Sequence, residues 1–171
     1  IENVFSDIDD STLVAKNGDN DWTINDENSG NVIDNNALIV NFTGFSHITG
    51  SDQVDNINII GAGNVTGQIN GAGGLDALTL QGIKDQTVEI GEEINENLNV
   101  INVERIVAKS TSNNTLIADN AANTWSIGAN DGNTLNYNGQ SISFSHFSAL
   151  SGGNQVDEFT ILSGDIKLIK M

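Results

Sequence analysis

Two stretches of this chain repeat each other at a distance of slightly more than 100 residues, and this repeat restricts the possible folds more than any other feature. Residues 11–24 (STLVAKNGDNDWTI) align without gaps on residues 114–127 (NTLIADNAANTWSI), with seven of fourteen positions identical. Residues 42–60 align on residues 144–162, with eight of nineteen positions identical. Matches this dense indicate an internal duplication.

Because the matching stretches follow one another in the same order, the chain is predicted to contain two units of one fold. The first unit covers residues 1–102, and the second, which is truncated, covers residues 103–171. We expect the units to stack into one continuous body, because a repeat that cannot bury its apolar face alone buries it against its neighbour.

Short apolar runs separated by Asn, Asp, Gly and Ser predict that the chain is all-β. Runs such as Ala77–Leu80 and Thr115–Ala118 are too short for helices, and Asn and Gly interrupt them every few residues. The pairs Asn17–Gly18, Asn70–Gly71 and Asn138–Gly139 are predicted to form tight turns on the outside.

A finer spacing favours a parallel β-helix, or β-solenoid, with coils of about 20 residues. The predicted strand centres near Leu38, Ile59, Thr79 and Asn99 follow one another at intervals of 20 or 21 residues. The chain has no proline, which would remove an N–H from a ladder between coils. The alternative architecture is an antiparallel β-sandwich or a tandem pair of Ig-like repeats.

The aromatic residues occupy equivalent positions in the two units. Trp22 matches Trp125, and the pairs Phe42/Phe45 and Phe144/Phe147 match each other. Alternation around the tryptophans predicts that these six side chains lie in the core. The alternative is that the tryptophans are exposed and stack on sugars.

Charge excludes several classes of function. Asp and Glu number 23 against 6 Lys and Arg, which gives a formal net charge of -17. A chain this acidic is not expected to bind nucleic acid.

The absence of cysteine excludes disulfides and thiolate metal sites. No apolar run approaches the roughly 18 residues of a membrane span, so no membrane insertion is expected.

Three motifs resemble the long repeats of giant surface and secreted proteins of Gram-negative bacteria. They are Asn123-Thr124-Trp125-Ser126-Ile127-Gly128, the stretch from Phe144 to Phe159, and the stretch from Gly67 to Leu78 (GQINGAGGLDAL). The chain is similar in these motifs to filamentous-haemagglutinin-like and haemolysin-type repeat proteins, which are adhesins. The resemblance implies a segment of an exported adhesin, either secreted or on the bacterial cell surface. Because the sequence begins without Met or a signal peptide, we expect it to be a piece of a longer protein.

The same resemblance suggests calcium binding at three glycine turns. Haemolysin-type turns follow the pattern G-G-x-G-x-D, in which backbone carbonyls and an Asp carboxylate bind Ca²⁺. The candidate ligands are Asp55, Asp76 and Asp157, although every one of these turns lacks at least one of the glycines. The alternative is that each carboxylate accepts hydrogen bonds from backbone N–H groups.

These observations favour a structural role, as a stalk or spacer whose partners are neighbouring repeats of the same parent chain. One alternative is a module of the adhesin that binds a host or matrix glycan or protein and is stabilised by calcium. Another is a fragment of a polysaccharide-active β-helix enzyme. We expect that the chain is not an enzyme, because its two histidines, His47 and His146, fall at non-equivalent positions of the repeat.

Overall fold

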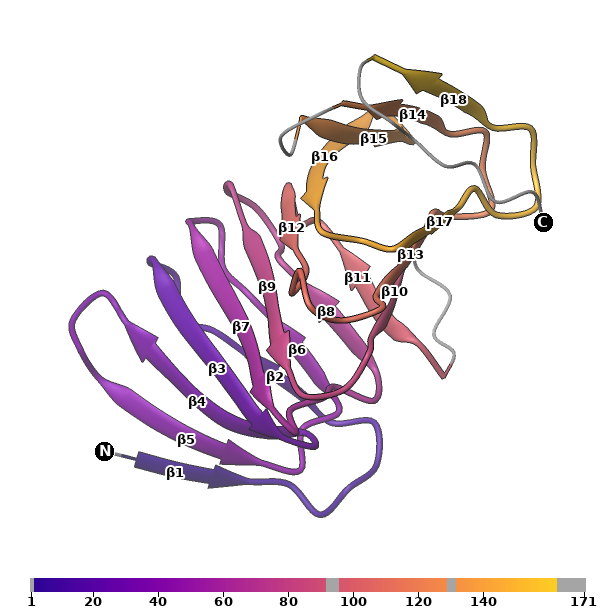
Figure 1. Cartoon of the computed structure of the whole chain (residues 1–171). Helices are drawn as coiled ribbons and strands as arrows, with labels where there is room; N and C mark the ends of the chain where they lie inside the picture. The colour runs from indigo at the N-terminus through magenta and orange to yellow at the C-terminus, as the bar shows by residue number, and fades with distance from the viewer. Residues whose placement is uncertain (1, 92–95, 129–131, 163–171) are drawn as a thin grey trace.

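The computed structural model of this chain describes residues 2–91, 96–128 and 132–162 (Figure 1). These residues form eighteen β-strands in two sheets and no helix. The all-β prediction is therefore confirmed, and both sheets contain parallel strands.

The larger sheet, here called sheet A, has eleven strands in the described part of the chain. In hydrogen-bonded order they are β1 (Glu2–Phe5), β5 (Ile39–Thr43), β4 (Ser29–Asp34), β3 (Asn20–Asp26), β7 (Asp55–Gly61), β9 (Ala77–Gly82), β12 (Arg105–Val107), β16 (Gln140–Ser145), β15 (Asn133–Tyr137), β14 (Thr124–Ile127) and β18 (Glu158–Ile161). The smaller one, sheet B, has seven. They are β17 (Ala149–Ser151), β13 (Thr115–Ile117), β10 (Thr87–Ile90), β11 (Leu98–Ile101), β8 (Gln68–Asn70), β6 (His47–Thr49) and β2 (Thr12–Val14).

The chain runs from one sheet to the other and back. Each such circuit, here called a pass, brings the chain back beside another pass (Figure 1). In sheet A, β3, β7, β9, β12 and β16 pair in parallel. Parallel neighbours need a crossover connection, and a strand of the opposite sheet supplies it here. Within the described residues, antiparallel pairing is confined to the meanders β3–β4–β5 and β14–β15–β16.

Alternation along each strand puts apolar side chains of the two sheets between them. Neighbouring strands of sheet A bring inward side chains into register as a row, which consists of Trp22, Ile57, Leu78 and Ile106. Every member of this row is at most 1% exposed. Sheet B places Ile48, Ile69, Val100 and Ile90 in a similar row. Full burial of one such aliphatic side chain contributes about 1.5–3 kcal/mol, so these rows are the main source of stability.

The predicted uniform spacing of about 20 residues is wrong for most passes. In sheet A only the step from β7 to β9 has this length, with Asp55 and Asp76 separated by 21 residues, and in sheet B only the step from β6 to β8 has it, with Ile48 opposite Ile69. The steps from β1 to β5, from β3 to β7 and from β9 to β12 take 38, 35 and 28 residues. Two features lengthen them: the meander β3–β4–β5 adds strands to sheet A, and β10 and β11 both join sheet B. Leu38, taken as a strand centre, precedes β5 and is 42% exposed.

The strand order of the first part of the chain recurs in the second. Sheet A begins with the order β1-β5-β4-β3-β7 and ends with β12-β16-β15-β14-β18, and the aligned stretches of sequence lie on corresponding strands. The unit boundary drawn from the sequence falls between β11 and β12. Residues 163–171 of the second unit lie outside the described residues.

The repeated aromatic residues form the same cluster twice. Trp22 meets Phe42 edge to face at 5.9 Å, and Phe42 meets Phe45 at 6.5 Å. In the second unit Trp125 meets Phe144 at 5.6 Å and Phe144 meets Phe147 at 6.1 Å, again edge to face. Both tryptophans are fully buried, while Phe45 and Phe147 are partly buried against the core. The exposed, sugar-stacking arrangement of the tryptophans is therefore absent.

Asparagine side chains join neighbouring passes on the outside of the sheets. Asn41 Nδ2 donates to Asn3 Oδ1 at 3.0 Å, and Asn102 Nδ2 donates to Asn70 Oδ1 at 2.9 Å. Each bond spans more than 30 residues of sequence. The abundance of Asn thus has a structural use, since an amide can donate to one neighbour and accept from another.

The three Asn-Gly pairs behave differently from one another. Asn138 and Gly139, with φ of 46° and 80°, form an exposed two-residue turn between β15 and β16, as predicted. Asn17 and Gly18 form a bend before β3. Asn70 instead ends strand β8, and the buried Gly71 continues the ladder by donating to the Ile101 carbonyl at 3.0 Å. The turn prediction is wrong there, because sheet B extends through this pair.

Candidate functional site

Three acidic residues lie side by side where strands of sheet A begin. Asp55 is the first residue of β7, Asp76 directly precedes β9, and Glu104 directly precedes β12. Their strands are neighbours in the sheet, so the three carboxylates form a short row, here called the acid ladder. Asp55 and Asp76 are at most 1% exposed.

Each carboxylate of the acid ladder accepts a hydrogen bond from the neighbouring pass. The Asp55 N–H donates to Asp76 Oδ1 at 2.8 Å, and the Asp76 N–H donates to Glu104 Oε2 at 2.7 Å. Asp55 in turn accepts bonds from the Ser51 N–H at 2.7 Å and from the Trp22 indole Nε1–H at 3.2 Å. These side chains satisfy backbone donors that would otherwise be buried without a partner.

Glycine precedes each of the three candidate Asp residues by five positions because the carboxylate folds back onto it. A Cβ on Gly50 or Gly71 would lie 2.5 Å from an oxygen of Asp55 or Asp76, respectively. A Cβ on Gly152 would lie 2.1 Å from Asp157 Oδ2. At Gly50 and Gly71 a Cβ would also clash with a backbone carbonyl oxygen of the neighbouring pass, so a side chain at these positions would displace the carboxylate and the backbone beside it. The glycine-to-aspartate spacing is explained by this close approach.

Asp76 carries the electrostatic cost of the acid ladder. Burial raises the pKa of its carboxyl from 3.8 to about 7, and the neighbouring charges of Asp55 and Glu104 add to the rise, while the bond from the Asp55 N–H opposes it. Its Oδ2 is buried and has no hydrogen-bond partner among the described residues. The ionised form is thus disfavoured by desolvation and by two like charges.

The second unit uses a different pairing at the equivalent corner. Asp157 Oδ1 accepts bonds from the backbone N–H and the side-chain Nδ2 of Asn123, at 3.0 and 2.8 Å. The indole Nε1–H of Trp125 is buried and has no partner in the described part of the chain, whereas its counterpart on Trp22 donates to Asp55. Trp125 instead stacks on Phe159, with ring centres 5.3 Å apart.

The structure therefore brings together two of the three predicted metal ligands and leaves the third apart. Asp55 and Asp76 are neighbours, while Asp157 pairs with Asn123 in the other unit. No group of three or more His, Cys, Asp or Glu suited to hold a metal ion occurs among the described residues. Calcium binding stays a prediction of the sequence, and the N–H donors directed at these carboxylates argue against it.

Sequence reasoning missed Glu104 as a member of this site. The signal was present, because Val103-Glu104-Arg105-Ile106 is the counterpart of the stretch that begins at Ile1 and contains Glu2. The pairing of Glu104 with Asp76, 28 residues away, depends on the irregular length of that pass, which the sequence pattern did not reveal.

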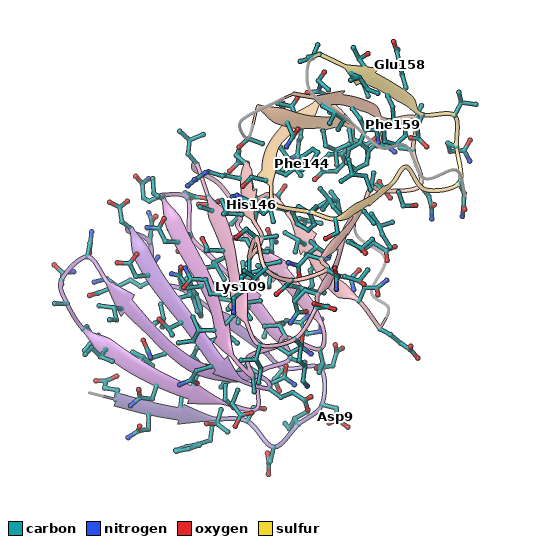
Figure 2. The ribbon with its side chains drawn as sticks, in the orientation of Figure 1. Asp9, Lys109, Phe144, His146, Glu158 and Phe159 are labelled. Atoms are coloured by element: carbon teal, nitrogen blue, oxygen red, sulfur yellow. The ribbon has the colours of Figure 1, made fainter. Side chains whose placement is uncertain are left out.

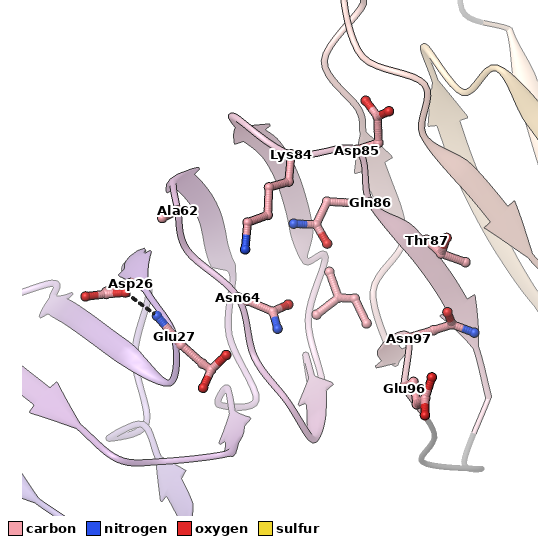
Figure 3. Close-up of a pocket in the computed structure, with 11 residues that line it drawn as sticks. Asp26, Glu27, Ala62, Asn64, Lys84, Asp85, Gln86, Thr87, Glu96 and Asn97 are labelled. Carbon is pink, nitrogen blue, oxygen red and sulfur yellow. Dashed lines mark hydrogen bonds between the residues drawn. The ribbon is translucent and has the colours of Figure 1, made fainter.

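Two hollows lie elsewhere on the surface. The first, of about 380 Å³, is lined by acidic groups and by Lys84, as Figure 3 shows. The second, of about 470 Å³, is lined by side chains that form hydrogen bonds with one another. Tyr137 Oη donates to Gln140 Oε1 at 2.7 Å, Gln140 Nε2 donates to Asn102 Oδ1 at 3.0 Å, and Asn138 Nδ2 donates to Asp119 Oδ2 at 3.1 Å.

Comparison of the chain with protein-family models, with curated proteins and with solved structures finds no match. Within the described ranges, no helix is long and apolar enough to span a membrane.

The two tryptophans offer a matched test of the acid ladder. Replacing Trp22 with Phe removes the hydrogen bond to Asp55, whereas Trp125→Phe removes no hydrogen bond to a described residue. We expect Trp22→Phe to lower the free energy of unfolding by about 1.5–3 kcal/mol more than Trp125→Phe, since a bond to a charged group is lost. Urea unfolding of both variants measures the difference. Equal losses would contradict the role assigned to the indole.

Asp76 should make stability depend on pH. Because its folded pKa, about 7, lies above 3.8, the folded state binds the proton more tightly, and stability falls as the pH rises from about 4 to about 7. Replacing it with Asn should remove this fall and raise the free energy of unfolding at pH 8 by up to about 4 kcal/mol. Denaturant unfolding from pH 4 to 8 gives both curves.

The control for this variant is Asp52→Asn. Asp52 is exposed, and its carboxylate accepts no hydrogen bond from the described residues. The control should keep the slope of the unmodified chain. A slope that survives in Asp76→Asn would show that other groups produce it.

The hydrogen bonds of the candidate ligands predict that calcium adds no stability. Ca²⁺ needs roughly six to eight oxygens directed at one point, but N–H groups point at Asp55, Asp76 and Asp157. We expect the same thermal midpoint in EDTA, in millimolar Ca²⁺ and in matched Mg²⁺. A rise in Ca²⁺ alone would indicate a site in the folded state, and its loss in Asp76→Asn would locate that site at the acid ladder.

Proposed function

We propose that this chain is a β-solenoid spacer, a segment of a larger exported surface protein that holds other domains at a distance. The observation that carries the proposal is the recurrence of one strand order in both units, in which β1 pairs in parallel with β5 as β12 does with β16, and β3 pairs in parallel with β7 as β14 does with β18. Such a body can grow by adding units without changing the existing ones. The resemblance to adhesin repeats supports a location outside the bacterial cell.

Burial at equivalent positions also supports the proposal. Trp22 and Trp125 are both fully buried, and Phe42 and Phe144 are 2% and 4% exposed. The features that recur in the two units are thus features of the core, as expected of a segment selected for stacking. In a spacer of this kind, function depends on length and stiffness, because a stack of hydrogen-bonded passes resists bending.

The acidic surface fits an extended segment of an exported protein. A formal net charge of -17 keeps neighbouring molecules apart and the chain in solution. Among the described residues, salt bridges by distance are limited to Lys16–Asp34 and His47–Asp10, so electrostatic pairing contributes little to the fold. The rows of buried apolar side chains and the hydrogen bonds between Asn side chains hold the passes together instead.

Insertion of one further repeat unit tests this role. Thr12 and Thr115 are equivalent, so a chain made of residues 1–114 followed by residues 12–171 joins the units in their native order. We expect this longer chain to fold cooperatively and to show a larger maximum dimension by small-angle X-ray scattering, extended by one unit.

The control joins residues 1–114 to residues 24–171, which places the wrong strand after the junction. This out-of-register chain should lose cooperative unfolding. If the in-register chain unfolds without cooperativity, or keeps the dimensions of the original, the spacer proposal fails.

A further inference from the structure

The larger of the two hollows described above combines residues of both units, and it is here called the junction hollow. Figure 2 shows Asp9 of the first unit at the bottom of the molecule and Phe159 of the second near the top. The volume of the junction hollow is about 470 Å³, within the range of about 300–1,000 Å³ that is usual for small-molecule sites. The first unit contributes Ile101 and Asn102 to its lining, and the second unit contributes Asp119, Tyr137, Asn138 and Gln140.

Hydrogen bonds between its side chains hold the walls of the junction hollow in place. Tyr137 Oη donates to Gln140 Oε1 at 2.7 Å, and Gln140 Nε2 donates to Asn102 Oδ1 at 3.0 Å. On the other side, Asn138 Nδ2 donates to Asp119 Oδ2 at 3.1 Å. Side chains that are already ordered lose less conformational entropy when a ligand binds.

These bonds leave both donors and acceptors free in the junction hollow. The amide nitrogens of Asn102, Asn138 and Gln140 each carry two N–H groups, and each donates one bond to a described residue. The Asp119 carboxylate accepts bonds from the Asn120 N–H and from Asn138, which leaves about half of its capacity. Hydroxyl groups of a ligand match this mixture, because each of them can donate and accept.

The two units differ at this corner. Asp119 aligns on Lys16, and the pairing of β14 with β15 and of β3 with β4 makes Tyr137 the equivalent of Asp34. In the first unit these two positions form a salt bridge, with Lys16 Nζ 3.5 Å from Asp34 Oδ2. Core residues recur in both units but these residues do not, so stacking of the passes does not require Asp119 and Tyr137.

The charge around the junction hollow favours a neutral ligand. The chain has a formal net charge of -17, Asp119 is part of the lining, and no basic side chain is among the described lining residues. An anion would therefore be repelled. Burial, together with the charges of Asp119 and Glu104, raises the pKa of Tyr137, so its hydroxyl stays protonated and uncharged at neutral pH.

We propose that the junction hollow binds a neutral hexose residue. The free amide N–H groups of Asn102, Asn138 and Gln140 donate to hydroxyl oxygens of the sugar, and the Asp119 carboxylate accepts bonds from its hydroxyl groups. Ile101 contacts the apolar C–H groups of the ring. This binding goes beyond the spacer role and does not depend on it, because the passes stack whether or not the hollow is filled.

Titration of the full chain with simple glycosides tests the proposal. The probes are methyl β-glucoside, methyl β-galactoside and the uronide of each, in which a carboxylate replaces the primary alcohol. In amide NMR spectra, at least one neutral glycoside should shift the side-chain signals of Asn102, Asn138 and Gln140, with a Kd on the order of 1 mM for so small a ligand. Its uronide should bind at least about tenfold more weakly, because its charge is repelled.

Two results of this titration would overturn the inference. One is the absence of any shift with both neutral glycosides at up to about 50 mM, far above the expected Kd. The other is a uronide that binds as tightly as its neutral counterpart or more tightly.

A pair of matched variants locates the binding. Asn138 has a φ of 46°, which glycine adopts readily, so Asn138→Gly should keep the turn and lose only the amide. We expect the neutral glycoside to bind this variant about three- to tenfold more weakly. The control is Asn35→Gly, at the equivalent exposed turn of the first unit, which should bind as the unmodified chain does. Equal Kd values for the two variants would show that the sugar binds elsewhere.

Asp119→Asn covers the case in which the turn variant fails to fold. This change keeps the shape of the side chain and removes its charge. The neutral glycoside should bind about tenfold more weakly, because a hydrogen bond to a charged group is lost, while the difference between the glycoside and its uronide should narrow. Unchanged Kd values for both probes would contradict the role assigned to Asp119 and overturn the proposed site.

Discussion

Parallel pairing of neighbouring passes is the constraint on which the rest of this structure depends. The backbone N–H and C=O groups of each pass must find partners on the next pass. At the corners where a strand begins, some backbone N–H groups have no backbone acceptor. Asp76 and Glu104 supply the missing acceptors at these corners. The apolar row that contains Trp22 and Ile57 can then stand in register directly behind them.

This solution has an electrostatic cost. Bonds from N–H groups stabilise a buried carboxylate, but three acids in one row repel each other and lose contact with water. Burial raises the pKa of Asp76, and its Oδ2 has no hydrogen-bond partner among the described residues. The second unit avoids a buried acidic neighbour at its equivalent corner by pairing Asp157 with the neutral Asn123. Its tryptophan loses its hydrogen-bond acceptor and gains a stacking partner in Phe159 instead.

Local pattern was sufficient to predict that the chain is all-β and that both tryptophans are buried. Alternation around Trp22 and Trp125 depends only on the two-residue period of a strand, which neighbouring structure does not change. Spacing between passes could not be predicted in this way. A meander such as β3–β4–β5 lengthens a pass without altering the pattern of any single strand, so the interval of about 20 residues held only between β7 and β9 and between β6 and β8.

The sequence by itself determined that the chain is all-β, that its two parts repeat one another, and which aromatic side chains recur at equivalent positions. These properties follow from composition, periodicity and alignment. Only the tertiary structure decided that Asp55, Asp76 and Glu104 meet, that Asp157 does not join them, and that Gly71 must lack a side chain. The physical reason is register: residues 21 and 28 positions apart become neighbours only when the length of each pass is set by how the whole sheet is paired.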